Sequence, residues 1–203
     1  MERVIAYIDG YNLYYGLRTK RWQRYYWLNL QQMMTRLLKP AQTLQSTKYF
    51  TARVSSPADK VKRQNTYLEA LGTLSDLHIF YGHFLEETII CRNCGHTYTT
   101  HHEKMTDVNI ALQMLTDAFQ NAFDTALLVS ADSDLVGPVR TIQTLFPAKK
   151  VVVVFPPARR SAALQKTAYK YLYLGQNVLR KSQFPEEVVK SNGFVLRRPS
   201  SWK

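Results

Sequence analysis

The residues best placed to do chemistry in this sequence are two aspartates, Asp132 and Asp134, which directly follow an apolar run. The run, residues 126–129, has the length and composition of a fully buried strand and stops at Ser130. Carboxylates at the carboxyl end of a core strand are costly unless something cationic holds them, and ligands of open α/β sheets bind at that edge. The alternative is a capped strand-to-helix turn, above all for Asp134, which opens the next predicted helix.

A similar arrangement occurs near the amino terminus. Residues 4–8 form another short apolar run, which ends in Asp9, Gly10 and Asn12. Gly10 permits a tight turn or a close backbone approach, and Asn12 could cap the following helix or help to place a ligand. Taken alone, the stretch is also compatible with an ordinary Asp-Gly turn.

A further acid lies at the start of a strongly amphipathic helix predicted over residues 106–122. Apolar residues at the i, i+3, i+4, i+7 spacing predict its buried face. This face comprises Val108, Ala111, Leu112, Leu115, Phe119 and Ala122, widened by Ile110 and Met114. Asp107 falls within this apolar arc, so either the helix dipole alone stabilises it or it points into a shared site.

An α/β fold has to position these acids. Continuous apolar runs that alternate with amphipathic helices are typical of a mostly parallel sheet covered on both faces. Acids that follow neighbouring strands of such a sheet converge at one edge. We expect one domain over residues 1–178 and a basic carboxyl-terminal tail over residues 179–203.

Residues 86–104 are predicted to form a small hairpin insert. Cys91 and Cys94 stand in the C-x2-C spacing of half a zinc site, and a closed structural zinc site needs four ligands. The nearby histidines that could complete it are His96, His101 and His102. Two protomers of a homodimer could instead each supply half a site, and the alternative to zinc is a pair of free thiols or a redox pair.

Charge and composition limit the partners. The 203 residues include 27 basic and 15 acidic side chains, a formal net charge of +12. Such an excess favours a polyanion, nucleic acid before membrane. No apolar run approaches the ~20 residues that span a bilayer, the amino terminus has no signal-peptide layout, and two cysteines make no disulfide framework. We therefore expect a cytoplasmic protein without a membrane partner.

Two basic stretches are of interest for nucleic-acid binding. Residues 13–27 mix tyrosines and tryptophans with Arg18 and other basic residues, which suits base stacking with phosphate contact but equally suits a partly buried surface helix. The predicted helix over residues 57–74 exposes Lys60, Lys62 and Arg63 in its first turns, and a solvated face explains them as well.

The candidate site consists of Asp9, Asp107, Asp132 and Asp134. Clustered carboxylates repel one another, and one would take up a proton unless a divalent cation neutralised them. Hard oxygen ligands suit Mg²⁺ or Mn²⁺, and such ions activate water for the hydrolysis of phosphodiesters.

Three sequence blocks carry a resemblance to a known family. They are IDGYNLYYGL at 8–17, EKMTDVNIALQML at 103–115 and ALLVSADSDLVGPVR at 126–140. In order and spacing they resemble NYN domains, in particular the LabA-like branch of the PIN-like nuclease group. The resemblance covers most of residues 3–175. It implies a Rossmann-like three-layer α/β/α fold and a metal-dependent ribonuclease.

The resemblance also implies residue roles. The metal-binding acids of the family match Asp9, Asp107 and Asp132, with Asp134 as a fourth member. Its small polar positions match Asn12, Ser130 and Ser133.

Three basic residues are candidate phosphate contacts. Lys104 belongs to a Glu-Lys pair that the family shares, and Arg159 and Arg160 directly follow the predicted strand 151–155. The sequence thus predicts an RNA-cleaving hydrolase. The main alternative is a non-catalytic RNA-binding or regulatory adaptor, and a third is a phosphatase or nucleotide hydrolase. No G-x-x-x-x-G-K-[ST] loop is present, which excludes the common nucleoside-triphosphate site.

Overall fold

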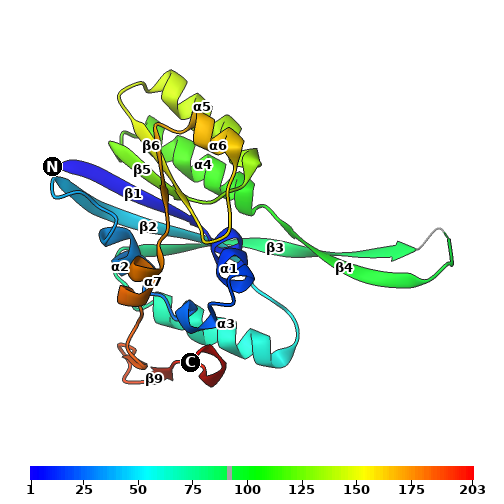
Figure 1. Ribbon diagram of the computed structural model, residues 1–203. Coiled ribbons are helices and arrows are strands. Elements are labelled where there is room, and N and C mark those ends of the chain that lie inside the picture. Colours follow the sequence, from blue (N-terminus) through cyan, green and yellow to red (C-terminus); the bar gives the residue numbers. More distant parts are fainter. Residues whose placement is uncertain (91–92) are drawn as a thin grey trace.

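The fold is built on a seven-stranded sheet in the order β4-β3-β2-β1-β5-β6-β7 (Figure 1). The computed structural model describes residues 1–90 and 93–203, with no side-chain description for residues 83–88 and 98–104. The strands are β1 (Glu2–Asp9), β2 (Gln42–Ala52), β3 (Leu77–Ile90), β4 (Thr97–Lys104), β5 (Thr125–Val129), β6 (Lys150–Phe155) and β7 (Lys170–Tyr173). Within this sheet β4 pairs antiparallel with β3, and the other pairings are parallel.

Helices cover both faces of the sheet. One face carries α1 (Gly10–Thr19), α2 (Leu30–Thr35), α3 (Ala58–Leu71) and α7 (Gln176–Lys181). The other face carries α4 (Thr106–Phe119), α5 (Val136–Leu145) and α6 (Ala162–Thr167). The predicted three-layer α/β/α fold with a mostly parallel central sheet is confirmed.

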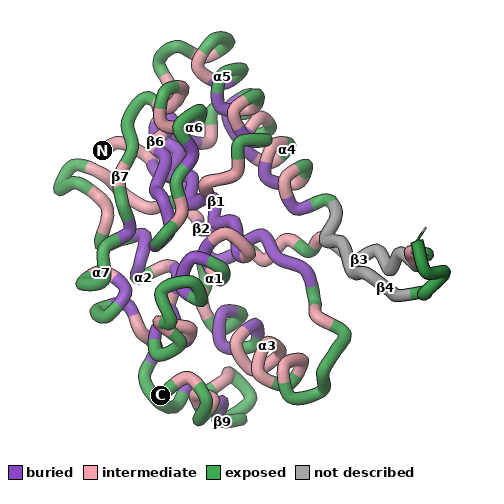
Figure 2. The backbone as a smooth tube through the Cα atoms, turned by 45° about the vertical axis from the view of Figure 1, so that its right-hand side comes forward, coloured by how far each residue is buried: buried purple, intermediate pink, exposed green. Residues whose placement is uncertain are grey.

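The central strand β1 is buried on both faces, because its residues alternate between two hydrophobic cores. Val4, Ala6 and Ile8 join the core under α1, α2 and α3. Ile5 and Tyr7 join the core under α4, α5 and α6. Figure 2 shows the buried stretches of β1 at the centre of the molecule. A strand with two buried faces is apolar throughout, which is why the run at 4–8 predicts a core strand.

The predicted buried face of the α4 helix is correct only in part. Ile110 and Met114 are fully buried, whereas Leu112 is 55% and Phe119 81% exposed. The side that faces the sheet also carries Asp117, which is buried.

A polar contact explains why Asp117 faces the sheet. Lys48 of β2 places its Nζ 2.7 Å from Asp117 Oδ2, and the Tyr7 hydroxyl donates to the same oxygen at 2.5 Å. Burial beside this carboxylate raises the pKa of Tyr7 well above its usual range, so its hydroxyl stays a donor. The apolar spacing could not identify this face, because its anchor is an ion pair with a residue 69 positions away.

The predicted insert at 86–104 is the outer part of the β3–β4 hairpin, which projects from the sheet (Figure 1). The two strands pair antiparallel from His83 with Lys104 to Ile90 with Thr97. Cys91 lies outside the described residues, as do the side chains of His101 and His102. Cys94 and His96 are exposed, and the zinc site stays a prediction.

The segment predicted as a basic tail, 179–203, folds against the domain. It forms a two-stranded ribbon of β8 (Glu187–Val189) and β9 (Val195–Arg197), followed by the 3₁₀ turn η3 (Ser200–Trp202). Its Val188 and Leu196 are buried in the α1-side core. Its last aromatic residue, Trp202, packs edge-on against Tyr26 with ring centroids 5.6 Å apart. Within the described chain, no helix is long and apolar enough to cross a bilayer.

Lys48→Met should lower the free energy of unfolding by about 3 kcal/mol, because Asp117 would keep a buried charge without its cation. The Lys48 and Asp117 side chains are only 13% and 8% exposed, so water screens the pair little. Equilibrium urea denaturation measures the change. The double variant Lys48→Met/Asp117→Asn should recover most of the loss, since no unpaired charge remains. A single variant as stable as the parent would show that the ion pair does not hold α4 in place.

Candidate metal centre

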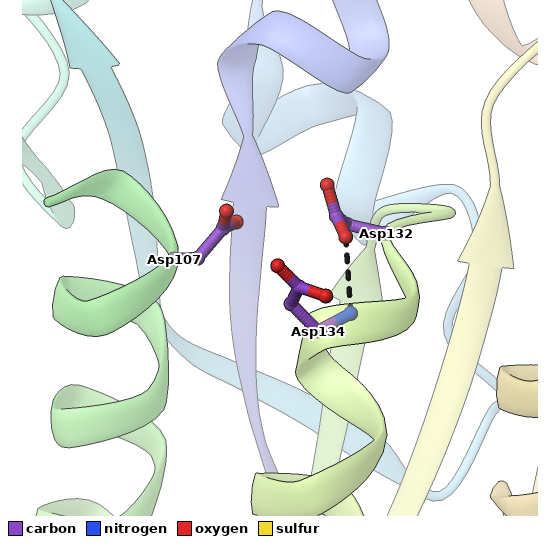
Figure 3. Close-up of side chains that lie close together, drawn as sticks. All are labelled: Asp107, Asp132 and Asp134. Atoms are coloured by element: carbon purple, nitrogen blue, oxygen red, sulfur yellow. Dashed lines mark hydrogen bonds between the residues drawn. The ribbon is translucent and has the colours of Figure 1, made fainter. Parts of the chain in front are cut away.

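Asp107, Asp132 and Asp134 come together at the carboxyl edge of the sheet (Figure 3). One carboxylate oxygen from each lies within 4.8 Å of the others. Asp107 reaches in from the first turn of α4, and the other two come from the turn after β5. Asp107 and Asp132 are half-buried and Asp134 is exposed, so the group opens to solvent on one side.

This donor set fits a divalent cation. Three acidic oxygens converge on one space, and Mg²⁺ and Mn²⁺ prefer such hard oxygen ligands and keep water in their remaining positions. The exposed side at Asp134 gives water or a substrate oxygen access to such an ion.

The order of the strands places the acids at one point. In the sheet, β2 is the neighbour of β1 on one side and β5 is its neighbour on the other. Ile8 pairs with Val129, so the next residues, Asp9 and Ser130, lie side by side where the two strands end. Their chains then turn to opposite faces, into α1 and α5, and ligands of α/β sheets bind where the connections diverge in this way.

Asp9 lies beneath the three-acid group rather than in it. It is only 2% exposed and caps α1 by accepting from the backbone N–H of Asn12 at 2.9 Å. The Asn12 side-chain amide donates to its other oxygen at 2.6 Å, and the Ser130 hydroxyl donates to that same oxygen at 2.9 Å. Burial raises the pKa of Asp9, these hydrogen bonds oppose the rise, and the nearby Asp132 charge adds to it.

Ser130 connects Asp9 to the three-acid group. Its buried hydroxyl accepts from the Asp132 backbone N–H at 3.0 Å while it donates to Asp9. On the same turn, Asn12 Oδ1 accepts from the Ala131 N–H at 3.3 Å. The two polar residues predicted beside the acids thus fix the turn that carries Asp132.

Asp132, not Asp134, caps the short 3₁₀ helix η2 (Ser133–Leu135). Asp132 Oδ1 accepts from the Asp134 N–H at 3.0 Å. The capping alternative for Asp134 is therefore wrong, and the cap holds the two carboxylates on one turn. Ser133 opens the same helix and is exposed.

Arg159 and Arg160 lie in the loop after β6, as predicted. The Arg159 guanidinium lies 5.7 Å from the Tyr15 ring centroid of α1, and Arg160 is exposed. The Lys104 side chain lies outside the described residues. Of these residues, Arg159 thus lies against α1.

Comparison with known proteins decides the family. The sequence profile of the NYN domain matches residues 3–179. The chain belongs to the NYN domain family. Family membership together with the carboxylate group indicates a nuclease-type hydrolase.

Two relatives extend the comparison. The NYN chain is 26% identical, over 98% of its length and 75% of the relative's, to the 6-hydroxy-3-succinoylpyridine 3-monooxygenase HspA of Pseudomonas putida. A crystal structure of a Vibrio parahaemolyticus protein of unknown function has the same fold. Its TM-score is 0.56 at 22% identity, over 87% of this chain and 94% of that one.

The NYN domain also contains a cavity of about 680 Å³ between α1, α3 and the 3₁₀ turn η3. Gly10 and Tyr11, the residues directly after Asp9, belong to its wall. At Gly10 a Cβ atom would lie 2.7 Å from the Tyr49 hydroxyl and from the Phe50 carbonyl oxygen, so only glycine allows α1 to start this close to β2. Sequence reasoning identified the aromatic and basic character of residues 13–27 but missed the cavity, because η3 closes it from the far end of the chain.

The free energy of unfolding of the parent, measured by urea denaturation with EDTA present, should depend on pH through Asp9, and Asp9→Asn should lack this dependence because an amide does not titrate. Because the pKa of Asp9 is higher in the folded than in the unfolded protein, the folded state binds more protons. The contribution of Asp9 to stability therefore falls as pH rises through these two values.

Relative to Asp9→Asn, the parent should accordingly lose stability as the pH rises above the pKa of free aspartic acid. As a control, Asp9→Ala should lower stability at every pH, since it also removes the helix cap. An Asp9→Asn variant whose stability varies with pH in the same way as that of the parent would contradict the assigned cause of the shift.

Proposed function

We propose that this NYN protein is a metal-dependent ribonuclease that hydrolyses RNA phosphodiester bonds with Mg²⁺ or Mn²⁺. The observation that carries the proposal is the convergence of Asp107, Asp132 and Asp134 within 4.8 Å at the open carboxyl edge of the sheet. A bound divalent ion would lower the pKa of water and neutralise charge on the phosphate. The LabA-like branch, the cytoplasmic location and a homodimer stay predictions from the sequence.

Some of the acidic side chains would bind the metal ion, and Asp9 would position them. Asp107, Asp132 and Asp134 would hold the ion through carboxylate oxygens. Asp9 is a positioning residue, because its hydrogen bond from Ser130 fixes the turn on which Asp132 lies. The buried Asp9 carboxylate also places negative charge behind the group, which favours a cation in front of it.

The basic surface supports a polyanionic substrate. The formal net charge is +12 although the proposed site is acidic. The basic surface would therefore attract RNA, and the acidic residues would contact it only at the proposed site. Long-range attraction of this kind raises the rate of encounter. Arg159, Arg160 and Lys104 are the proposed contacts with the RNA backbone.

Asp132→Asn should lower the rate of RNA cleavage by at least about a hundredfold and leave RNA binding largely intact, because one neutral oxygen replaces a charged ligand. Cleavage of labelled single-stranded RNA with added Mn²⁺ measures the rate, and electrophoretic shift in EDTA measures binding. The matched control is Asp76→Asn, since Asp76 is an exposed acid outside the site.

If Asp132→Asn cleaves as fast as the parent, the assignment of the metal centre is wrong. If the parent binds RNA in a salt-sensitive way but shows no EDTA-sensitive cleavage, the protein is the non-catalytic RNA-binding adaptor. Release of phosphate from mononucleotides, with RNA left intact, would identify a phosphatase.

A second candidate is oxygenation of a hydroxylated pyridine, because the relative that carries this name matches 98% of the chain. The cavity beside Asp9, whose lining includes six tyrosines and Trp202, adds weight to it. Oxygen uptake with 6-hydroxy-3-succinoylpyridine and a reduced nicotinamide tests it directly. Uptake that depends on this compound, without RNA cleavage, would replace the hydrolase proposal.

A further inference from the structure

We propose that the cavity between α1, α3 and η3 is a subsite for an unpaired nucleotide of the RNA strand that is cut at the three-acid group. The proposal rests on the proposed ribonuclease function and adds the substrate class, single-stranded RNA, and the place where one of its bases is read.

The size of the cavity suits a nucleotide. Its volume is about 680 Å³, within the ~300–1,000 Å³ typical of small-molecule sites. It lies on the α1 side of the sheet and is bounded by α1, α3, the end of β2 and the last residues of the chain. A double helix has its bases stacked inside, so only a base that has left the stack could enter.

The walls are aromatic and only partly packed. Tyr14, Tyr26 and Trp202 form a continuous wall, with ring centroids 5.1 Å apart for the first pair and 5.6 Å for the second. All three are half-buried and line the cavity, so part of their ring surface faces the hollow. Aromatic surface of this kind stacks with any base.

The floor is polar but uncharged. Tyr49 is buried and lines the cavity beside Thr51. Its hydroxyl keeps its proton at neutral pH, as in any tyrosine, and burial raises its pKa further, to about 12; together with Thr51 it gives the cavity polar groups for the edge of a base. Hydrogen bonding from such groups is how proteins recognise unstacked bases.

The charged residues that line the cavity are all basic. Its lining includes Arg18, Lys60 and Arg63 and no acidic residue. Arg63 is ion-paired with Asp59, and Arg18 lies 6.0 Å from the Tyr15 ring centroid. A ligand with an anionic group beside a flat ring matches this lining, and a nucleotide has that chemistry.

The cavity and the three-acid group meet at the same strand end. Gly10 and Tyr11 line the cavity, and Asp9 directly before them is tied through Ser130 to Asp132. A strand whose phosphate lies at the acids could therefore place a neighbouring base over the first turn of α1 and into the cavity.

Binding is tested in the Asp132→Asn protein with EDTA, so that no cleavage occurs. Of the 3 tryptophans, Trp202 lines the cavity, so its fluorescence reports occupancy. Adenosine monophosphate and a short oligoadenylate should both quench it, and oligoadenylate annealed to oligouridylate should not.

Tyr14→Leu should weaken binding of oligoadenylate about tenfold, the loss expected for one stacked base. Its control is Tyr169→Leu, which changes an exposed tyrosine after α6 that does not line the cavity and should have no effect. Equal affinity of the two variants would overturn the proposal.

Lys60→Gln tests the role of a basic lining residue and leaves the aromatic wall unchanged. It should weaken binding and lower the slope of log affinity against log salt by about 0.7, as expected for one phosphate contact on a single strand. Lys62→Gln, an exposed residue of the same helix outside the lining, should change neither. Because both are surface substitutions, this pair stays informative if Tyr14→Leu fails to fold.

The outcomes separate this proposal from the ribonuclease proposal. Quenching by nicotinate but not by either adenine ligand would overturn the RNA assignment and make the cavity a site for small aromatic acids. If Tyr14→Leu raises KM for RNA without changing kcat, the cavity binds substrate. If Asp132→Asn still cleaves RNA, the metal centre is wrong, while the binding result stands on its own.

Discussion

The hydroxyl of Ser130 is the contact on which the candidate site depends. It donates to the buried Asp9 and accepts from the backbone of Asp132, so it joins the ends of two neighbouring strands. The carboxylate of Asp9 is almost fully buried, and such a group is stable only when several donors satisfy it. Asn12 supplies two of these donors. The turn after β5 thereby acquires one fixed position, and the cap that Asp132 provides then fixes Asp134.

The sequence predicted the parts of the fold that follow from burial on both faces. β1 and β5 are apolar at every inner position because each is covered by helices above and below. It misjudged α4, where apolar spacing favoured Leu112 and Phe119 and the structure exposes both. The orientation of that helix is set by Lys48 and Asp117. Local periodicity carries no information on an ion pair between distant segments.

The candidate site was predictable for a related reason. An acid directly after a buried strand has a position fixed by the strand, so Asp9 and Asp132 could be placed from the sequence alone. The position of Asp9 relative to the other three acids could not be predicted. Whether Asp9 joins the others or supports them from below depends on the Ser130 and Asn12 rotamers. The aromatic cavity could not be predicted either, because its wall combines Tyr14 of the first helix with Trp202 at the far end of the chain.

The three-acid group and the aromatic cavity share one structural origin. At the end of β1 the chain turns into α1 on one face, and at the end of β5 it turns through η2 into α5 on the other. The acids occupy the α4–α5 side of this divergence and the aromatic cavity the α1–α3 side. The proposed chemistry and the proposed recognition of a base therefore use separate side chains on one framework, joined through Asp9 and Ser130.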